Sequence, residues 1–342
     1  MKRFAVAVDL GGTNLRTAAV GTDAEIWIAH KELTEVSGGK GAVLDQLVRA
    51  IQRLIIEARE ADGQPVGVGV GTPGAIQLAT GVVTDAPNLP DWHYVPLREI
   101  LTARLPLPVW IENDANAAAL GEHWAGAAQG VENLVCLTLG TGVGGGIILD
   151  GKLWRGVDGT AGEIGHMSLD PAGPRCSCGR TGCLEAYASA TGIVRMAREA
   201  MGRGARTRLG DLTRAQPGDL TAALIYRAAM DGDRLARRVL QRMGWYLGIA
   251  LANLLNLLNV ELIVLSGGVT EAWDLFIDAA EMEMRRRAFE IPARRARIVR
   301  AMWGDEAGLL GAASLVWRGV MPDSRLGIHA RAVAVMVRSI PL

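Results

Sequence analysis

Residues 3–14 read RFAVAVDLGGTN, an alternating apolar run that ends in a turn containing two glycines. Such a run predicts a short β-strand, and the glycines predict a tight turn into the next strand, LRTAAVGT. The pattern returns from residue 134 as LVCLTLGTGVGGG, again followed by strand-like residues. One arrangement of strand, glycine turn, strands and helix thus occurs twice. We therefore expect an α/β protein with two related lobes that face each other across a cleft.

Helical periodicity separates the predicted strands. Apolar residues recur at the spacing of an amphipathic helix over residues 41–61. Further helices are expected at 115–126, 191–201, 219–229, 231–258 and 306–319, and buried strands at 66–74, 109–114, 261–269 and 296–301. The expected domains are a small lobe at 1–112 that is completed by the helix at about 306–319, a large lobe at 113–305, and a tail at 320–342 with no assigned role.

The composition is that of a globular protein. The chain has 342 residues, of which 49% are hydrophobic and 21% charged, and its formal net charge is zero. Zero net charge disfavours non-specific binding to nucleic acid, which requires a basic surface. The apolar start stops at Asp9, before a signal peptide would be complete, and the long apolar run at 246–265 contains three asparagines and a glutamate. We therefore expect a cytosolic protein with no membrane segment.

Glycine turns after strands expose backbone N–H groups that can converge on phosphate oxygens. The first turn adds the Asp9 carboxylate, placed to hold a phosphate-bound Mg²⁺, and the Thr13 hydroxyl. The alternative is a plain hairpin that uses glycine only for its backbone freedom. A second such turn and a third glycine pair, Gly267 and Gly268, favour a nucleotide. The lysine of a Walker loop is missing and GVGGG leads into a strand, so neither a P-loop nor a Rossmann site is expected.

Asp114 follows a predicted strand and opens a predicted helix in WIENDANAAALGE. It has two interpretations of equal weight. It is an ordinary helix N-cap, or it is a carboxylate that accepts a proton from a substrate hydroxyl, kept ionised by the helix N-terminus.

Four potential metal ligands lie within eighteen residues in the stretch GHMSLDPAGPRCSCGRTGCLE (165–185). They are His166, Cys176, Cys178 and Cys183. Three cysteines and one histidine suit a closed, tetrahedral, structural zinc site. A disulfide is disfavoured in a reducing compartment, and free thiols rarely cluster in a polar loop. We therefore expect Zn²⁺ to staple this loop rather than to activate water.

A glutamate stands at each end of the same loop, Glu163 in GEIGH and Glu185 in CLE. Carboxylates accept hydrogen bonds from paired hydroxyls, so the two residues suit a clamp for a polyol. The alternative is that both are ordinary surface glutamates.

Together these segments resemble the ROK family of sugar kinases and repressors, within the actin-like, hexokinase-like ATPase superfamily. The resemblance is carried in order by DLGGTN, GTPG, ENDANAAALGE, TLGTGVGGGI, GTAGEIGHM, CSCGRTGCLE and LSGGV, over about nine-tenths of the chain. It implies an actin-like, hexokinase-like fold of two RNase H-like α/β lobes around a cleft, with a zinc-stapled loop. Repressors of the family carry an additional helix-turn-helix domain, for which we expect no room before the first strand.

The resemblance also implies a role for each site residue. Asp114 is expected to take the proton from the 6-hydroxyl of a hexose. The remaining hydroxyls are expected to bind Asn88, Asn113, Glu163, His166 and Glu185, so that His166 offers one ring nitrogen to zinc and the other to the sugar. ATP is expected on Gly11, Gly12, Thr13, Thr141, Gly142, Gly267 and Gly268, with Mg²⁺ on Asp9.

Two segments, APNLPDW and LPVWIENDANAAALGEH, look most like those of bacterial glucokinases. D-glucose is therefore the expected hexose, with N-acetylmannosamine and N-acetylglucosamine as alternatives. The non-enzymatic alternatives are a sugar-sensing protein without turnover and a nucleic-acid-binding zinc protein. The presence of Asp9 and Asp114 disfavours the first, and the neutral charge disfavours the second. The resemblance further implies a homodimer.

Overall fold

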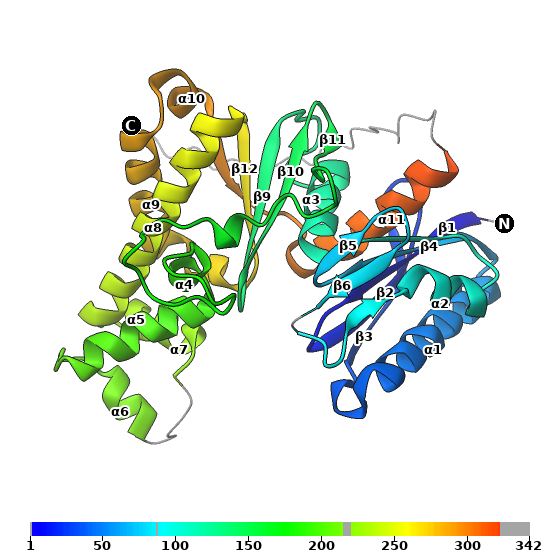
Figure 1. Cartoon of the computed structure of the whole chain (residues 1–342), viewed down its shortest axis with the longest axis horizontal. Coiled ribbons are helices and arrows are strands. Elements are labelled where there is room, and N and C mark those ends of the chain that lie inside the picture. Colours follow the sequence, from blue (N-terminus) through cyan, green and yellow to red (C-terminus); the bar gives the residue numbers. More distant parts are fainter. Residues whose placement is uncertain (1, 87, 215–219, 322–342) are drawn as a thin grey trace.

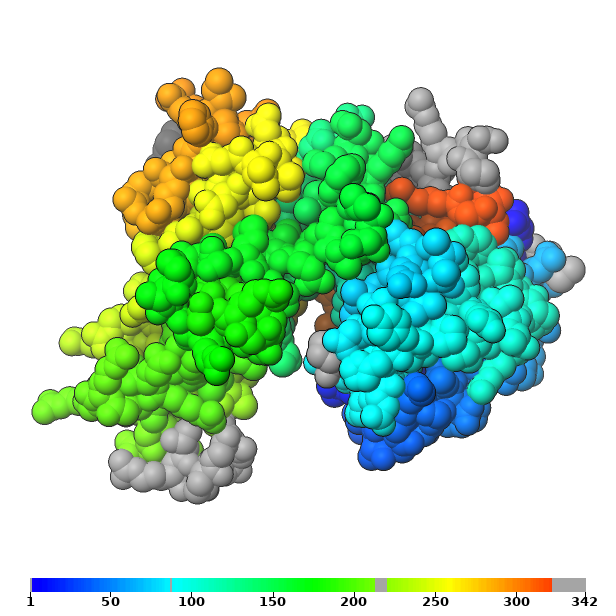
Figure 2. Space-filling view, viewed as in Figure 1, coloured from blue at the N-terminus to red at the C-terminus, as the bar shows by residue number. Residues whose placement is uncertain are grey.

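The computed structural model of the chain has two lobes (Figure 1). Between them the molecular surface is hollowed into a cleft (Figure 2). The structure describes residues 2–86, 88–214 and 220–321.

The sheet of the first lobe begins with the meander that the opening residues predict. Three antiparallel strands come first, and two parallel strands then extend the sheet, in the order β3-β2-β1-β4-β8. Their bounds are β1 Lys2–Leu10, β2 Asn14–Val20, β3 Ile26–Leu33, β4 Gly63–Thr72 and β8 Val109–Asn113. β1 is buried from Phe4 to Val8, as expected for a central strand covered on both faces.

The second lobe repeats this topology strand for strand, in the order β11-β10-β9-β12-β13. Again the first three strands are antiparallel and the last two are parallel to the central one. Their bounds are β9 Leu134–Leu139, β10 Val143–Leu149, β11 Lys152–Leu153, β12 Leu262–Ser266 and β13 Arg297–Arg300. The prediction of two related α/β lobes is confirmed.

Each sheet carries helices on its faces, and each face has its own hydrophobic core. In the first lobe, α1 (Gly39–Glu60) packs its apolar side on the sheet and α2 (Leu97–Arg104) lies beside it. The other helices are α3 Asp114–Ala125, α4 Glu185–Ala188, α5 Ala190–Gly202, α6 Leu209–Arg214, α7 Ala222–Met230, α8 Arg234–Leu258, α9 Trp273–Arg287, α10 Glu290–Arg295 and α11 Ala307–Val320. Residues of α5, α7, α8 and α9 form the large core on the second sheet.

α11 returns from the far end of the chain to cover the first sheet. Its residues Leu309 and Trp317 share a core with Ala5 and Ala18 of the first two strands. α11 also packs against α3 so closely that a Cβ on Gly311 would lie 1.6 Å from the carbonyl oxygen of Ala117. Only glycine permits this approach, so α3 and α11 form a tight helix pair between the two sheets (Figure 1).

A buried carboxylate fixes the chain where it crosses back to α11. Glu122 of α3 is fully buried and accepts backbone N–H groups from Met302 at 3.0 Å and Trp303 at 2.9 Å. It also accepts the N–H of Ala127 at 2.8 Å. Three donors offset the cost of burying this charge, and they hold the segment before α11 against α3.

Most predicted elements lie within a few residues of the observed ones, and the differences have local causes. α8 begins at Arg234 rather than 231, because Asp233 caps it by accepting the N–H of Ala236 at 2.9 Å. A three-stranded sheet of β5 (Ala75–Gln77), β6 (Val82–Asp85) and β7 (His93–Val95) was not predicted, nor was α2. Position 219 of one predicted helix and residues 322–342 of the tail lie outside the described residues.

The run at 246–265 is the end of α8 followed by β12, as predicted. Asn259 ends the helix in the left-handed conformation, with φ of 54°. Across the described part of the chain, every helix is too short or too polar to span a membrane.

Candidate functional site

The turn from β8 into α3 carries the predicted catalytic residue. Asn113, not Asp114, is the N-cap: its side-chain oxygen accepts the N–H groups of Ala115 at 3.0 Å and Asn116 at 3.2 Å. Its amide nitrogen donates to the carbonyl of Gly74 at 3.2 Å. Asp114 is therefore the first residue of the helix, and its carboxylate accepts one N–H of the first turn, that of Ala115, through Oδ1.

Asp114 lies in an environment that raises its pKa to about 6. Burial is the largest cause, and the neighbouring carboxylates of Asp9 and Glu163 add to it, whereas the N–H of Ala115, 2.8 Å from Oδ1, opposes it. Two other predicted site carboxylates, Asp9 and Glu163, thus lie close enough to raise the pKa of Asp114. A carboxylate with a pKa near 6 is ionised at neutral pH and is still basic enough to accept a proton in a reaction.

Asp9 stands near the end of β1 and is paired with a residue that the sequence analysis did not identify. Arg16 of β2 donates to Asp9 at 2.9 Å and to Asp305 at 2.5 Å. Burial nevertheless raises the pKa of Asp9, more than Arg16 lowers it. A Cβ on Gly308 would lie 3.3 Å from the Asp9 carboxyl carbon, so the first turn of α11 faces the same carboxylate.

Arg16 is the direct cross-strand partner of Asp9 in the β1–β2 hairpin. Opposite charges at facing positions of a hairpin attract, so the pairing of Asp9 with Arg16 could have been predicted from the sequence. The contact of Arg16 with Asp305, which is 289 positions away, could not.

The first glycine turn is stabilised from within the first lobe. The N–H of Gly11 donates to the carbonyl of Asn14 at 2.9 Å, and the carbonyl of Thr13 accepts the N–H of Thr34 at 3.0 Å. A Cβ on Gly12 would lie 2.4 Å from the Asn88 carbonyl oxygen. The structure therefore brings Asn88 directly against this turn.

The second and third glycine turns meet at one edge of the second sheet, because β9 and β12 are parallel neighbours. Gly267 has a φ of +90°, and a Cβ there would lie 2.5 Å from the carbonyl oxygen of Leu139. Gly268, the next residue, faces open space. In the second turn, the carbonyl of Thr141 accepts the hydroxyl of Thr191, at the start of α5, at 3.1 Å.

The four predicted metal ligands come together. The ligand atoms of His166, Cys176, Cys178 and Cys183 all lie within 4.8 Å of one another, and the cysteines are free thiols. The Sγ atoms of Cys178 and Cys183 are 3.8 Å apart. With metal–sulfur bonds of about 2.3 Å, two corners of a tetrahedron lie about 3.8 Å apart, so this cluster fits a tetrahedral ion.

His166 presents its two ring nitrogens to different partners. Nδ1 lies 3.7 Å from the Cys176 sulfur, and Nε2 lies 3.8 Å from the carboxylate of Glu163. The ring therefore bridges the metal-ligand cluster and one of the two glutamates predicted to bind sugar. Glu163 itself is exposed.

Glu185, the second of these glutamates, is held by both neighbouring loops. Its Oε1 accepts the hydroxyl of Ser177 at 2.7 Å and is 3.4 Å from the Cys176 sulfur. Its Oε2 accepts the N–H of Val143 at 3.1 Å, and a Cβ on Gly142 would lie 2.5 Å from it. The carboxylate thus lies between the metal-binding loop and the second glycine turn.

Behind Asp114 lies a buried ion pair that the sequence analysis did not identify. Glu112 is 2% exposed and accepts Arg155 Nε at 2.7 Å. Its other oxygen accepts the side-chain amide of Asn116 at 3.0 Å. Arg155 belongs to the loop that leads to Glu163, so this ion pair ties the loop to the turn at Asp114.

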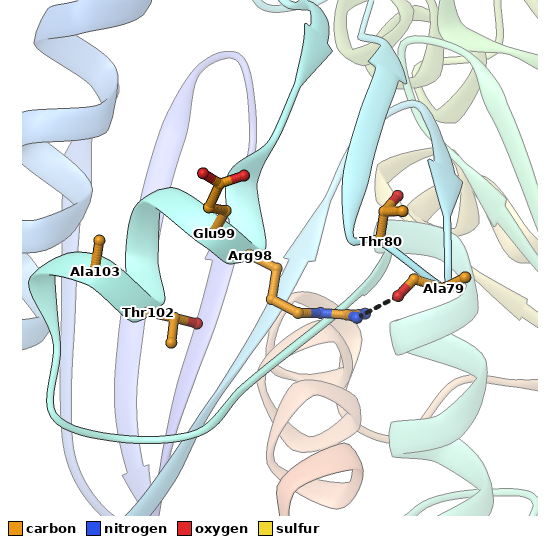
Figure 3. A pocket seen from close by; sticks show the side chains of 6 residues that line it. All are labelled: Ala79, Thr80, Arg98, Glu99, Thr102 and Ala103. Carbon is orange, nitrogen blue, oxygen red and sulfur yellow. Dashed lines mark hydrogen bonds between the residues drawn. The ribbon is translucent and has the colours of Figure 1, made fainter.

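A surface hollow of about 520 Å³ lies elsewhere, on the first lobe, and contains none of the predicted site residues. Figure 3 shows Arg98 of α2 reaching the turn between β5 and β6, where it donates to the carbonyl of Ala79 at 3.0 Å. The guanidinium also donates to the carbonyl of Leu78 at 2.7 Å, so its terminal nitrogens bind the backbone of this turn. The residues that line the hollow are Ala79, Thr80, Arg98, Glu99, Thr102 and Ala103.

Comparison with known proteins matches the ROK family over residues 5–318. The glucokinase of Halalkalibacterium halodurans is 39% identical over 92% of this chain and 95% of its own length. A xylose repressor of Caldicellulosiruptor bescii is 32% identical over 91% of this chain but 77% of the repressor. Among solved structures, a ROK family glucokinase from Streptomyces griseus in complex with glucose and AMPPNP has a TM-score of 0.77 and 35% identity, covering 91% of this chain and 98% of that chain.

Proposed function

The chain belongs to the ROK family and is a sugar kinase, and from this premise we propose that it transfers the terminal phosphoryl group of ATP to the 6-hydroxyl of D-glucose. Glucose is supported by the 39% identity to a glucokinase over nearly the whole of both chains. N-acetylmannosamine and N-acetylglucosamine are the alternative substrates. The repressor relative is the reason to keep a sugar-sensing protein without turnover as the non-enzymatic alternative.

The observation that carries the proposal is the environment of Asp114. Its carboxylate stands at the N-terminus of α3 with a pKa raised to about 6, and the Asp9 and Glu163 carboxylates contribute to that shift. In the proposed reaction, Asp114 orients the sugar hydroxyl and accepts its proton as the new P–O bond forms. Positioning and electrostatics account for most of the rate enhancement in phosphoryl transfer, so a fixed base of this pKa suits the chemistry.

We propose that the sugar is bound by Asn88, Asn113, Glu163, His166 and Glu185 in addition to Asp114. The distance of 3.8 Å between His166 Nε2 and the Glu163 carboxylate supports this, since it brings two of the proposed sugar ligands together. Asn113 uses its oxygen for capping and one N–H for Gly74, which leaves its second amide hydrogen for a hydroxyl.

We propose that ATP is bound by the backbone of the glycine turns, at Gly11, Gly12, Thr13, Thr141, Gly142, Gly267 and Gly268. Mg²⁺ bound with ATP would neutralise negative charge on the phosphates. Asp9 is the residue proposed to hold the Mg²⁺ ion. Asp9 already pairs with Arg16, so the cation would join a carboxylate that the protein holds in place.

We propose Zn²⁺ for the cluster of His166, Cys176, Cys178 and Cys183. The sulfur–sulfur distance of 3.8 Å and the ligand set support this assignment. With four protein ligands the ion has no open position, so its contribution is to hold the loop and the orientation of His166. A homodimer remains a prediction of the family resemblance. A cytosolic location and lobes at 1–112 with 306–319 and at 113–305 remain predictions from the sequence pattern.

The proposal is tested by measuring ADP release over a panel of hexoses with Mg²⁺-ATP, for the wild type and for Asp114→Asn. We expect glucose to give the highest kcat/KM, and the variant to bind glucose but lose about 10²–10⁴-fold in kcat. Higher kcat/KM for an N-acetylhexosamine would reassign the substrate. No ADP release with any hexose would favour the sugar sensor, and near-normal turnover by the variant would remove Asp114 as the base.

A further inference from the structure

Ser177 lies between two metal ligands in CSCG, and its hydroxyl has two neighbours, the Cys176 sulfur at 3.8 Å and the carboxylate of Glu185. Its Oγ is 2.7 Å from Glu185 Oε1, the shortest contact that this carboxylate makes with the loop. The thiol of Cys176 approaches the same oxygen at 3.4 Å, but a thiol is a much weaker donor than a hydroxyl. Ser177 is therefore the principal donor to Oε1.

The other oxygen of Glu185 is fixed from the opposite side. Val143 N–H donates to Oε2 at 3.1 Å, and the adjacent Gly142 leaves no room for a Cβ, which would lie 2.5 Å from Oε2. A donor on each oxygen fixes the plane of the carboxylate. Oε2 accepts only the Val143 N–H among the described groups, so this oxygen can still accept a hydrogen bond from a ligand.

We propose that Ser177 is a positioning residue for sugar binding: its hydroxyl fixes the Glu185 carboxylate in the orientation that accepts the sugar hydroxyls. The inference rests on the proposed function, which makes Glu185 a sugar ligand. Without the Ser177 hydroxyl, Oε1 would keep only the weaker contact with the Cys176 thiol, and the carboxylate would be free to rotate about its contact at Oε2. The cost falls on sugar binding, because Ser177 itself touches neither the nucleotide turns nor Asp114.

The test compares Ser177→Ala with Ser177→Thr and with Ser168→Ala. Ser168 is a matched control: it is an exposed serine of the same loop whose hydroxyl donates to the Thr181 carbonyl at 3.2 Å. For each variant we measure glucose affinity by calorimetry, KM and kcat by ADP release, melting temperature, and zinc content. We expect Ser177→Ala to raise the Kd and KM for glucose about fivefold to tenfold. We expect its kcat and its KM for ATP to stay within twofold of the wild type. Its zinc content and its melting temperature should be unchanged.

Threonine at 177 keeps the hydroxyl and restores wild-type affinity, and Ser168→Ala has no effect. Unchanged glucose affinity in Ser177→Ala would overturn the inference. A loss of glucose affinity that comes with a loss of zinc, or that Ser168→Ala shows equally, would also overturn it. Neither result would contradict the proposed kinase activity. A wild type that binds glucose without turnover would overturn the proposed function alone, since calorimetry would still report the effect of Ser177. A wild type that binds no hexose would overturn both.

Discussion

Asp114 is subject to opposing influences that the structure makes explicit. Burial and the carboxylates of Asp9 and Glu163 raise its pKa, and the N–H of Ala115 at the start of α3 lowers it, with a net value of about 6. From the residue pattern, Asp114 could be either a helix N-cap or a general base, because either residue of an Asn-Asp pair can cap a helix. The capping contacts show that Asn113 is the N-cap, and they depend on backbone geometry that no pattern of residue types specifies; the role of Asp114 as base stays a proposal.

The raised pKa predicts an acid limit to the activity. Because only the ionised carboxylate accepts a proton, kcat/KM should be level above about pH 7 and fall about tenfold per unit below about pH 6. The measurement is kcat/KM for glucose from pH 5 to 8 at constant ionic strength. An acid limb below pH 5, near the ordinary range of aspartate, would show that the environment of Asp114 differs in the working enzyme.

The raised pKa of Asp114 also predicts how the stability of the protein depends on pH, which can be measured independently of activity. A folded-state pKa above the ordinary aspartate value of 3.8 means that folding favours the protonated carboxyl, so this contribution to stability is present below about pH 4 and is lost as the pH rises through about 6. Asp114→Asn removes the buried charge. We expect the variant to melt at a higher temperature than the wild type at pH 7, and the difference to shrink toward pH 4. Equal melting temperatures at pH 7 would contradict the burial of this charge.

At the scale of elements, the metal ligands of the loop from Gly165 to Glu185 could be predicted from the sequence, but the contacts of the loop with the rest of the protein could not. The spacing of one histidine and three cysteines identified the cluster, and the structure brings all four ligand atoms together. The contacts of Glu185 with Val143 and Ser177 were not predictable, since they depend on how this loop folds against a strand forty residues earlier. The small sheet of β5–β7 was missed because its strands are only three or four residues long.

The metal is expected to support sugar binding from a distance. Cys178→Ala should lower the zinc content from about one atom per chain to near zero, and should raise the KM for glucose, because His166 and Glu185 lose the fixed loop that holds them. Elemental analysis and ADP release provide the measurements. Cys136→Ala is the control, since this thiol is buried in β9 outside the cluster and its loss should leave the zinc content unchanged. Full zinc in Cys178→Ala would exclude the residue as a ligand.

For the whole molecule, the repeat read from the two glycine-rich segments predicted the antiparallel strands that begin each sheet, because buried strands and glycine turns leave clear patterns. The order of the later parallel strands was not predicted. How the two lobes pack against each other could not be predicted from the sequence. It depends on backbone-to-backbone approach between α3 and α11 at Gly121 and Gly311, where a Cβ would overlap a carbonyl oxygen of the partner helix.

Gly311→Ala should therefore destabilise the protein through this helix contact. Its Cβ would lie 1.6 Å from the Ala117 carbonyl oxygen, so the two helices must separate, at a cost of about 1–3 kcal/mol or more. The control is Gly41→Ala, at an open position within α1, where alanine should be neutral or stabilising by up to about 1 kcal/mol. Chemical denaturation measures both. Equal stabilities for the two variants would mean that α3 and α11 are less closely packed than described.

The return of α11 to the first sheet has a consequence for synthesis on the ribosome. Ala5 and Ala18 are synthesised long before their apolar neighbours Leu309 and Trp317. Until α11 has been made, this face of the sheet lacks the side chains of α11 that cover it in the folded protein, so the nascent chain must keep that surface from binding other chains. We therefore expect the docking of α11 to complete this core only after the strands of the first sheet have been made.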